Sequence, residues 1–283
     1  MPTLPPRDLH LIMIGFGIFA AIVVLIDLVL GFSWLITIDN PRPLFAPKWS
    51  VVHAWFGIQA MVVITIGLEL PIIGLIAGLP PNNPLKLAWA AVATLPVQAA
   101  VFCAVVVFFV RIVYGERMRD IGLRKRPHDW EVLYGIGAGL AGLVIIGIVQ
   151  GLANVTIVEI WGSHVLKHLK IIQNALYVGT LLKPLESGIG LLALAVAGAI
   201  IAPFSEELVF RGFLFNALKK RFNPAAAIIV SGFVFAAFHL PLLYIPAYIA
   251  MGLYMGYVYH KTGSLWVTFF LHMTNNAFAF LVR

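Results

Sequence analysis

The feature that most constrains this chain is a series of long apolar runs along nearly its whole length. Most are near the length of about 20 residues that crosses a bilayer as a helix. They lie at residues 9–34, 50–79, 87–113, 132–152, 188–208, 224–242, 243–260 and 264–282. Because lipid cannot satisfy backbone polar groups, such runs must be helical. The sequence therefore predicts an all-α, polytopic transmembrane bundle of about eight membrane helices.

The composition excludes several other classes of protein. Hydrophobic residues make up 61% of the chain and charged residues 11%, whereas a soluble globular chain is about 25% charged. The net charge of +7 would suggest nucleic-acid binding in a soluble protein. Here the basic residues lie between the apolar runs, where they suit anionic headgroups. We therefore expect membrane lipids, and no nucleic acid, as partners; the sequence says nothing of the oligomeric state.

The distribution of Lys and Arg predicts an orientation. The basic connection 114–131 is placed in the cytoplasm by the positive-inside rule. Alternation of the spans then puts the basic residues 219–221 on the same side and both termini outside. We expect an integral, multi-pass membrane protein whose active site faces the cytoplasmic side. The long connection 155–186 mixes apolar residues with His and Lys, which favours an amphipathic helix at the membrane surface.

A cluster of ionisable residues ends the 188–208 run, in the sequence Glu206-Glu207-Leu208-Val209-Phe210-Arg211. Such groups are costly within membrane segments and mark functional sites. Glu207 and Arg211 are at i, i+4 and can pair on one helix face, whereas Glu206 is offset from Glu207 by about 100°. One carboxylate can therefore be held by arginine while the other points into a cavity as a general base.

Two further groups lie on later runs. Phe235 and His239 share a helix face, and a histidine there can accept a proton or orient a water. His272 and Asn276 are at i, i+4 and can both donate hydrogen bonds, as an oxyanion requires. Alone, each group is also explained by hydrogen bonding between helices. Together, the three groups supply what water-mediated hydrolysis of a peptide bond needs.

The ordered set EExxxR, FxxxH and HxxxN resembles the CAAX prenyl protease and bacteriocin-processing (CPBP) family, which includes the type II CAAX prenyl endopeptidases. Residues that flank the motifs fit too: Ala202-Pro203, Arg211-Gly212 and Thr262-Gly263-Ser264-Leu265-Trp266, with a weaker element at 119–123. The resemblance covers roughly residues 185–283. It divides the chain into N-terminal transmembrane helices at 1–113, without specific resemblance, a basic cytoplasmic loop at 114–131 and a catalytic membrane domain at 132–283.

The resemblance implies an intramembrane endopeptidase that acts on a peptide or a lipidated, membrane-associated protein. Glu206, assisted by His239, would activate a water. His272 and Asn276 would form the oxyanion hole. The supporting residues that it implies are Glu207, Arg211 and Phe235.

No cofactor is expected, although zinc is an alternative. Members of the family have also been described as metalloproteases, and Glu206, His239 and His272 are residue types that bind zinc. The sequence contains no HExxH motif. Asn276 has a place in the oxyanion hole but is not a usual zinc ligand, which favours the metal-independent hypothesis.

Two other functions use the same residues differently. A non-proteolytic scaffold or bacteriocin-immunity-type protein would need them only for packing, and a transporter would need them to relay protons. The transporter is disfavoured because the sequence shows no repeated halves. One geometrical difficulty also arises. If the 188–208 run ends at the cytoplasmic surface, Glu206 lies near that surface, whereas His239 lies about 20 Å along its own run.

Overall fold

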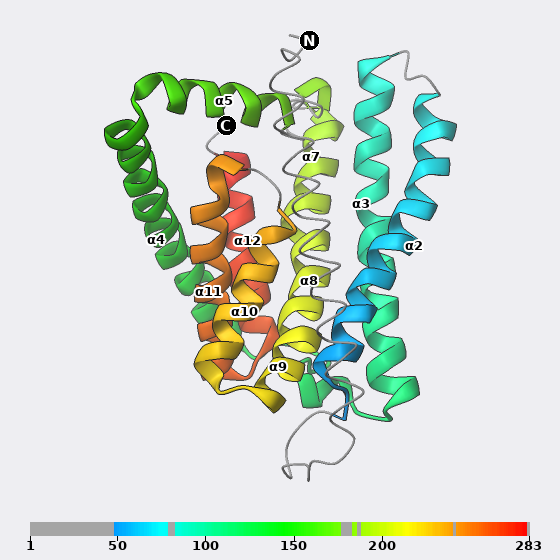
Figure 1. Ribbon diagram of the computed structural model, residues 1–283. Coiled ribbons are helices and arrows are strands. Elements are labelled where there is room, and N and C mark those ends of the chain that lie inside the picture. The colour runs from blue at the N-terminus through cyan, green and yellow to red at the C-terminus, as the bar shows by residue number, and fades with distance from the viewer. Residues whose placement is uncertain (1–47, 79–82, 177–182, 186–187, 240–241, 282–283) are drawn as a thin grey trace.

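The computed structural model describes residues 48–78, 83–176, 183–185, 188–239 and 242–281. Every regular element in these ranges is a helix (Figure 1). The predicted all-α helical bundle is therefore confirmed. The first predicted run, 9–34, lies outside the described residues.

The α-helices carry the labels of Figure 1. They are α2 (Val51–Ala77), α3 (Pro84–Val107), α4 (Asp129–Trp161), α5 (Ser163–Leu176), α7 (Gly188–Val196), α8 (Ala202–Glu207), α9 (Asn216–Arg221), α10 (Pro224–Ala237), α11 (Ile245–Thr262) and α12 (Leu265–Leu281). In the described part, four continuous helices are long and apolar enough to cross a membrane: Val51–Ala77, Pro84–Val113, Asp129–Trp161 and Gly188–Arg221. The chain is therefore a multi-pass membrane protein.

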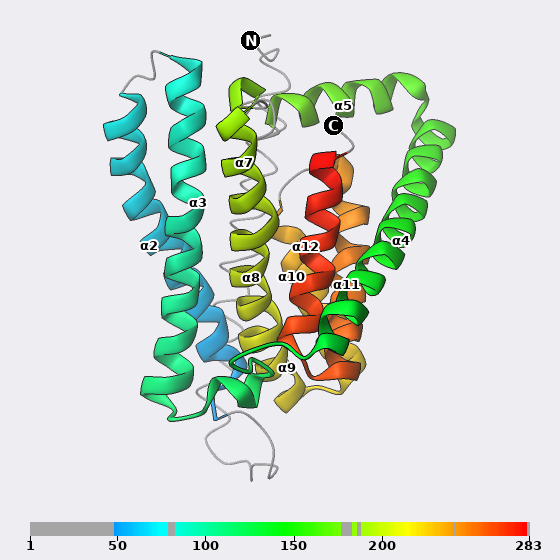
Figure 2. The ribbon, with the colours of Figure 1, turned by 180° about the vertical axis from the view of Figure 1, so that it is seen from behind.

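Two groups of helices flank a central one. The continuous helix α7–α8–α9 runs through the middle, with the α2–α3 pair on one side and α4, α10, α11 and α12 on the other (Figures 1 and 2). Local sequence sets the helix starts. Asn83 and Asn223 cap α3 and α10 with their side chains, and each is followed by a proline at the first helical position, where a missing N–H does no harm.

The central helix corrects the predicted run 188–208. It continues to Arg221, because Glu207 and Arg211 pair inside the bundle and their charges do not end the helix. Two π-helical stretches, Ala197–Ile201 and Leu208–Phe215, flank the glutamates; such wider turns often occur at functional sites. Two more boundaries were wrong. The run 132–152 is part of the 33-residue α4, and the run 224–242 ends as a helix at Ala237.

Helix α5 differs from the others because it lies across the bundle (Figure 1). Its Val165, Leu166 and Leu169 are partly buried, while Lys167 and Lys170 are exposed. The amphipathic helix predicted within 155–186 is therefore present.

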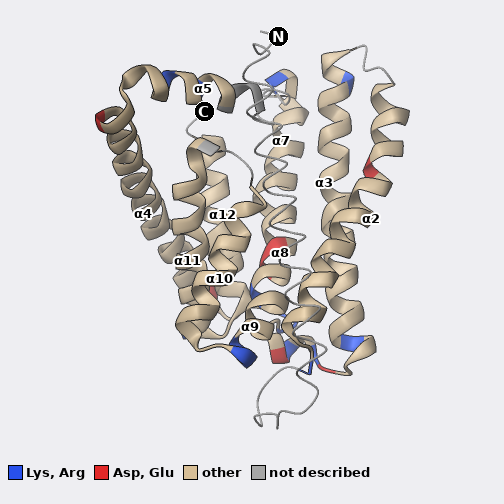
Figure 3. Ribbon diagram, in the orientation of Figure 1, with Lys and Arg blue, Asp and Glu red and all other residues tan. Residues whose placement is uncertain are grey.

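Most Lys and Arg residues of the described part of the chain lie at one end of the bundle (Figure 3). We call this the basic end. It is the end at which α4 and α12 begin and at which α9 and α11 finish. The opposite end, which α5 crosses, is called the far end.

Candidate active site

The glutamates and His239 reach the same depth, which removes the difficulty left by the sequence. Glu206 is 15 residues before Arg221 along the central helix, and His239 is 15 residues after Pro224, where α10 begins. At 1.5 Å per residue, each lies roughly 20 Å from the basic end. The glutamates are deeper than the sequence indicated because their helix does not stop at residue 208.

Glu206 lies between two histidines from different helices. Its Oε2 atom is 3.8 Å from Nε2 of His239 and 3.8 Å from Nε2 of His272. These distances are too long for direct hydrogen bonds. The Oε2 atom is buried and has no hydrogen-bond partner among the described residues. A buried carboxylate oxygen without a partner is costly, and an ordered water or ion is one way in which such an oxygen is satisfied.

His239 lies in the turn after α10, and its protonation is fixed by the backbone. Its Nδ1 is 2.8 Å from the carbonyl oxygen of Phe235. Since that oxygen can only accept, Nδ1 carries the proton, and Nε2 of the neutral ring carries a lone pair. The Nε2 that faces Glu206 is therefore a hydrogen-bond acceptor. The spacing of the FxxxH motif also places the Phe235 ring against the His239 ring, with centroids 4.4 Å apart.

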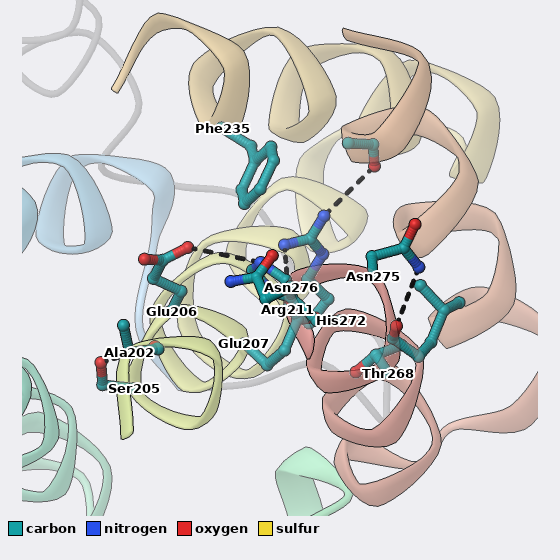
Figure 4. A network of polar contacts seen from close by, with 12 residues as sticks. Ala202, Ser205, Glu206, Glu207, Arg211, Phe235, Thr268, His272, Asn275 and Asn276 are labelled. Atoms are coloured by element: carbon teal, nitrogen blue, oxygen red, sulfur yellow. Dashed lines mark hydrogen bonds and ion pairs between the residues drawn. The ribbon is translucent and has the colours of Figure 1, made fainter. Parts of the chain in front are cut away.

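Glu207 holds the other side of the site (Figure 4). Its Oε1 accepts from Arg211 Nη1 at 2.9 Å and from His272 Nδ1 at 3.0 Å. Glu207 and Arg211 are each about 1% exposed. Arg211 also donates to the carbonyl of Gly252 and lies 4.7 Å from the centre of the Phe235 ring. The predicted Glu207–Arg211 pair is present, and it orients His272 so that Nε2 points toward Glu206.

Asn276 lies one turn beyond His272 on α12. Its Nδ2 donates to the carbonyl of Gly198, in the first π-helical stretch, at 2.9 Å, which leaves its second N–H for another acceptor. Asn276, His272 and His239 line one cavity of about 410 Å³. Glu206 is not among the lining residues, but both of these histidines lie 3.8 Å from its Oε2 atom.

Sequence reasoning missed Tyr248 and Asn275. The Tyr248 ring stacks on His239, with centroids 4.4 Å apart, and no spacing rule connects the two residues. Asn275 is buried and donates to the carbonyls of Gly139 and Leu271, so it joins α12 to α4. Its position beside Asn276 was visible in the sequence, but the helix on which it packs was not.

The residues that would bind a metal satisfy only part of what zinc requires. Both histidines direct Nδ1 to an acceptor and leave Nε2 available, as metal-binding histidines do. However, ligand atoms around tetrahedral zinc lie about 3.4 Å apart, and the two distances from Glu206 are 3.8 Å. In the ranges that the structure covers, no three His, Cys, Asp or Glu are placed to hold a metal ion. The distances from Glu206 Oε2 to the two histidine Nε2 atoms are therefore longer than tetrahedral zinc requires.

Comparisons with known proteins give the family that the chain resembles. Residues 188–278 match the family model described as Type II CAAX prenyl endopeptidase Rce1-like. The resemblance to the CAAX endopeptidases is therefore confirmed. The Rce1-like match includes all three motifs, from Glu206 to Asn276.

Two curated relatives each resemble about a third of this chain. YdiL of Bacillus subtilis (strain 168), which carries the name of a membrane peptidase, is 31% identical over 88 residues, 31% of this chain and 36% of that protein. MroQ of Staphylococcus aureus (strain USA300), named a membrane-embedded CAAX protease, is 38% identical over 93 residues, 30% of this chain and 37% of that protein. The chain thus spans little more than a third of the length of these relatives. No solved structure matches.

Proposed function

We propose that the chain is an intramembrane endopeptidase of the CAAX type, which hydrolyses a peptide bond of a membrane-associated or lipidated substrate. The observation that carries the proposal is the position of Glu206. Its buried, unpartnered Oε2 is equally far, at 3.8 Å, from the Nε2 atoms of His239 and His272. The names of the two relatives, a membrane peptidase and a membrane-embedded CAAX protease, support proteolysis at the membrane.

The first step is the attack of water on the peptide carbonyl. A water in the gap donates one hydrogen bond to Glu206 Oε2 and the other to His239 Nε2, which is an acceptor in the neutral ring. Its oxygen lone pair is then free for the carbonyl carbon. As the C–O bond forms, Glu206 takes the proton as general base, and the electron pair of the carbonyl bond moves to the oxygen.

The second step is the breakdown of the tetrahedral intermediate. Its oxyanion accepts from the second N–H of Asn276 and from His272 Nε2. Because Nδ1 of His272 donates to Glu207, Nε2 donates only when the ring carries both protons. The C–N bond then breaks, and the proton on Glu206 passes to the leaving nitrogen, which restores the carboxylate. Glu207 and Arg211 are positioning residues, because they act through His272.

The test is cleavage by purified protein in detergent, of a prenylated peptide and of an apolar peptide library. Glu206→Gln keeps the shape of the side chain but cannot take the proton, so we expect activity to fall by about 10²-fold or more. Glu159→Gln, at an exposed position on α4, is the matched control and should cleave normally. Full activity of Glu206→Gln would refute Glu206 as the general base, whereas no cleavage by folded wild-type protein would favour the scaffold function. Loss of activity with chelator, restored by zinc, would refute the metal-independent mechanism.

A further inference from the structure

The site is closed toward the basic end. The nine residues Glu207–Phe215, which follow Glu206 in that direction, are all buried. Among them, Phe213 is fully buried, and Phe215 packs edge-on against Tyr259 of α11. The hydroxyl of Tyr259 in turn donates to the carbonyl of Ile121, in the basic connection. Packed side chains therefore fill the space between the catalytic cluster and the basic end.

The cavity extends from the histidines in the other direction. Its walls include Tyr244 and Tyr248, at the start of α11, and Phe278 and Phe280, near the end of α12. These positions belong to the far end of the bundle (Figure 2). Tyr244 is 40% exposed. The mouth of the cavity therefore lies at the far end, beside Tyr244.

Helix α4 forms the outer side of this mouth. All its buried residues lie between Glu131 and Gly142, where glycines allow close contact with α12. Beyond Gly142 the helix leans away from α11 and α12, and α5 turns back across the bundle (Figure 1). Leu143 and Ile146 of this part line the cavity, while Val144 is 62% exposed. The mouth thus has an apolar flank that faces lipid.

The charges indicate on which side of the membrane the mouth lies. The Lys and Arg residues at helix ends and connections of the basic end are Lys48, Arg111, Arg117, Arg119, Arg124, Lys125, Arg126, Lys219, Lys220, Arg221 and Lys261. Those at the far end, within the described ranges, are Lys86, Lys167, Lys170 and Lys183. An excess of Lys and Arg marks the cytoplasmic side of a multi-pass protein.

We infer that the catalytic cavity opens on the side of the membrane opposite the basic loops, away from the cytoplasm, between α4 and the α11–α12 pair. Its substrate is a peptide segment embedded in that outer leaflet, which enters past the apolar flank of α4. This inference rests on the proposed function for the identity of the occupant. It reverses the cytoplasmic orientation of the site that the sequence suggested.

The test is thiol labelling of the full chain in intact cells with a charged, membrane-impermeant reagent. The chain has one cysteine, Cys103, so Cys103→Ala gives a background for single-cysteine variants. Tyr244→Cys reports on the mouth, Ser163→Cys on exposed α5 and Lys125→Cys on the exposed basic loop. We expect the first two to react in intact cells and the third to react only after permeabilisation.

Each other result overturns the inference. If Tyr244→Cys reacts only after permeabilisation, the mouth faces the cytoplasm; if it never reacts, the cavity is not open at the far end. If Lys125→Cys reacts from outside, the whole orientation is reversed. The labelling does not depend on activity, so it stands even if the chain proves not to be a protease. If cleavage is measured, a bulky label on Tyr244→Cys should block it, and one on Ser163→Cys should not.

Discussion

The Arg211–Glu207 ion pair offers the sharpest test of how this site is held together. Both side chains are about 1% exposed, and Arg211 Nη1 lies 2.9 Å from Glu207 Oε1. Replacement of Arg211 by methionine fills similar space with an apolar chain but leaves the Glu207 carboxylate buried beside one histidine. Removal of one partner from a buried pair costs about 3–5 kcal/mol.

A double-mutant cycle separates the pair from simple packing. Glu207→Gln should also destabilise, because it leaves the guanidinium without its carboxylate. Glu207→Gln combined with Arg211→Met removes both charges together. We therefore expect the double variant to be more stable than the sum of the single changes predicts, by about 1–3 kcal/mol.

The assay is reversible unfolding in mixed detergent micelles, followed by helix content. The free energies of unfolding of wild type, the two single variants and the double variant give the coupling energy directly. Additivity within about 0.5 kcal/mol would mean that the two residues do not interact energetically. The ion pair would then contribute nothing to the fold, and the account of how His272 is oriented would lose its basis.

Three further changes test the surroundings of the site. Gly139→Val places a branched side chain against α12, where even a Cβ would lie 2.6 Å from its neighbour, and should destabilise by about 1–3 kcal/mol in the same unfolding assay. Gly137→Val, which meets open space, should cost less; equal losses would refute the close packing. Gly122→Ala, at φ +83, would place a Cβ against the carbonyl oxygen of Gly263, so it should destabilise more than Gly115→Ala, which at φ +65 has the same left-handed strain of about 1 kcal/mol but no close neighbour; equal losses would refute the close approach to Gly263. If the proposed activity holds, Tyr248→Phe should keep the stacking on His239 and most activity, while Tyr248→Ala should lower kcat by about 2- to 10-fold; equal activities would show that the stacking is irrelevant.

The sequence predicted the helices that depend on hydropathy alone. The runs 50–79 and 87–113 correspond to Val51–Ala77 and to α3 with its π-helical extension to Val113. The sequence misplaced the end of the 188–208 run, where a charge inside the membrane is neutralised by partners that include a residue distant in sequence. The central helix continues past Glu206 because Glu207 is held by Arg211 and by His272, 65 residues away in sequence. A hydropathy pattern contains no information on such a partner.

The candidate site was predictable in its members but not in its geometry. The motif spacings placed Glu207 with Arg211 and His272 with Asn276 on common faces, and the structure brings these residues together. The roles assigned to them stay predictions until activity is measured. The acceptor for His239 is a backbone carbonyl, and its stacking partner Tyr248 comes from a different helix. Neither contact depends on a residue pattern, so no reading of the sequence could have supplied them.

The contact between His272 and Glu207 also has a consequence for biogenesis. The two residues are 65 positions apart, and ribosomes add about 5–20 residues per second. After Glu207 is synthesised, it therefore waits roughly 3–13 seconds before its histidine partner exists. During that interval Arg211, four residues downstream, is already available to neutralise it. Arg211 thus first neutralises Glu207 while this segment enters the membrane. Only later, when α12 has been made, does the pair contact His272. A chain stalled before α12 would contain Glu207 and Arg211 but would lack His272 and Asn276.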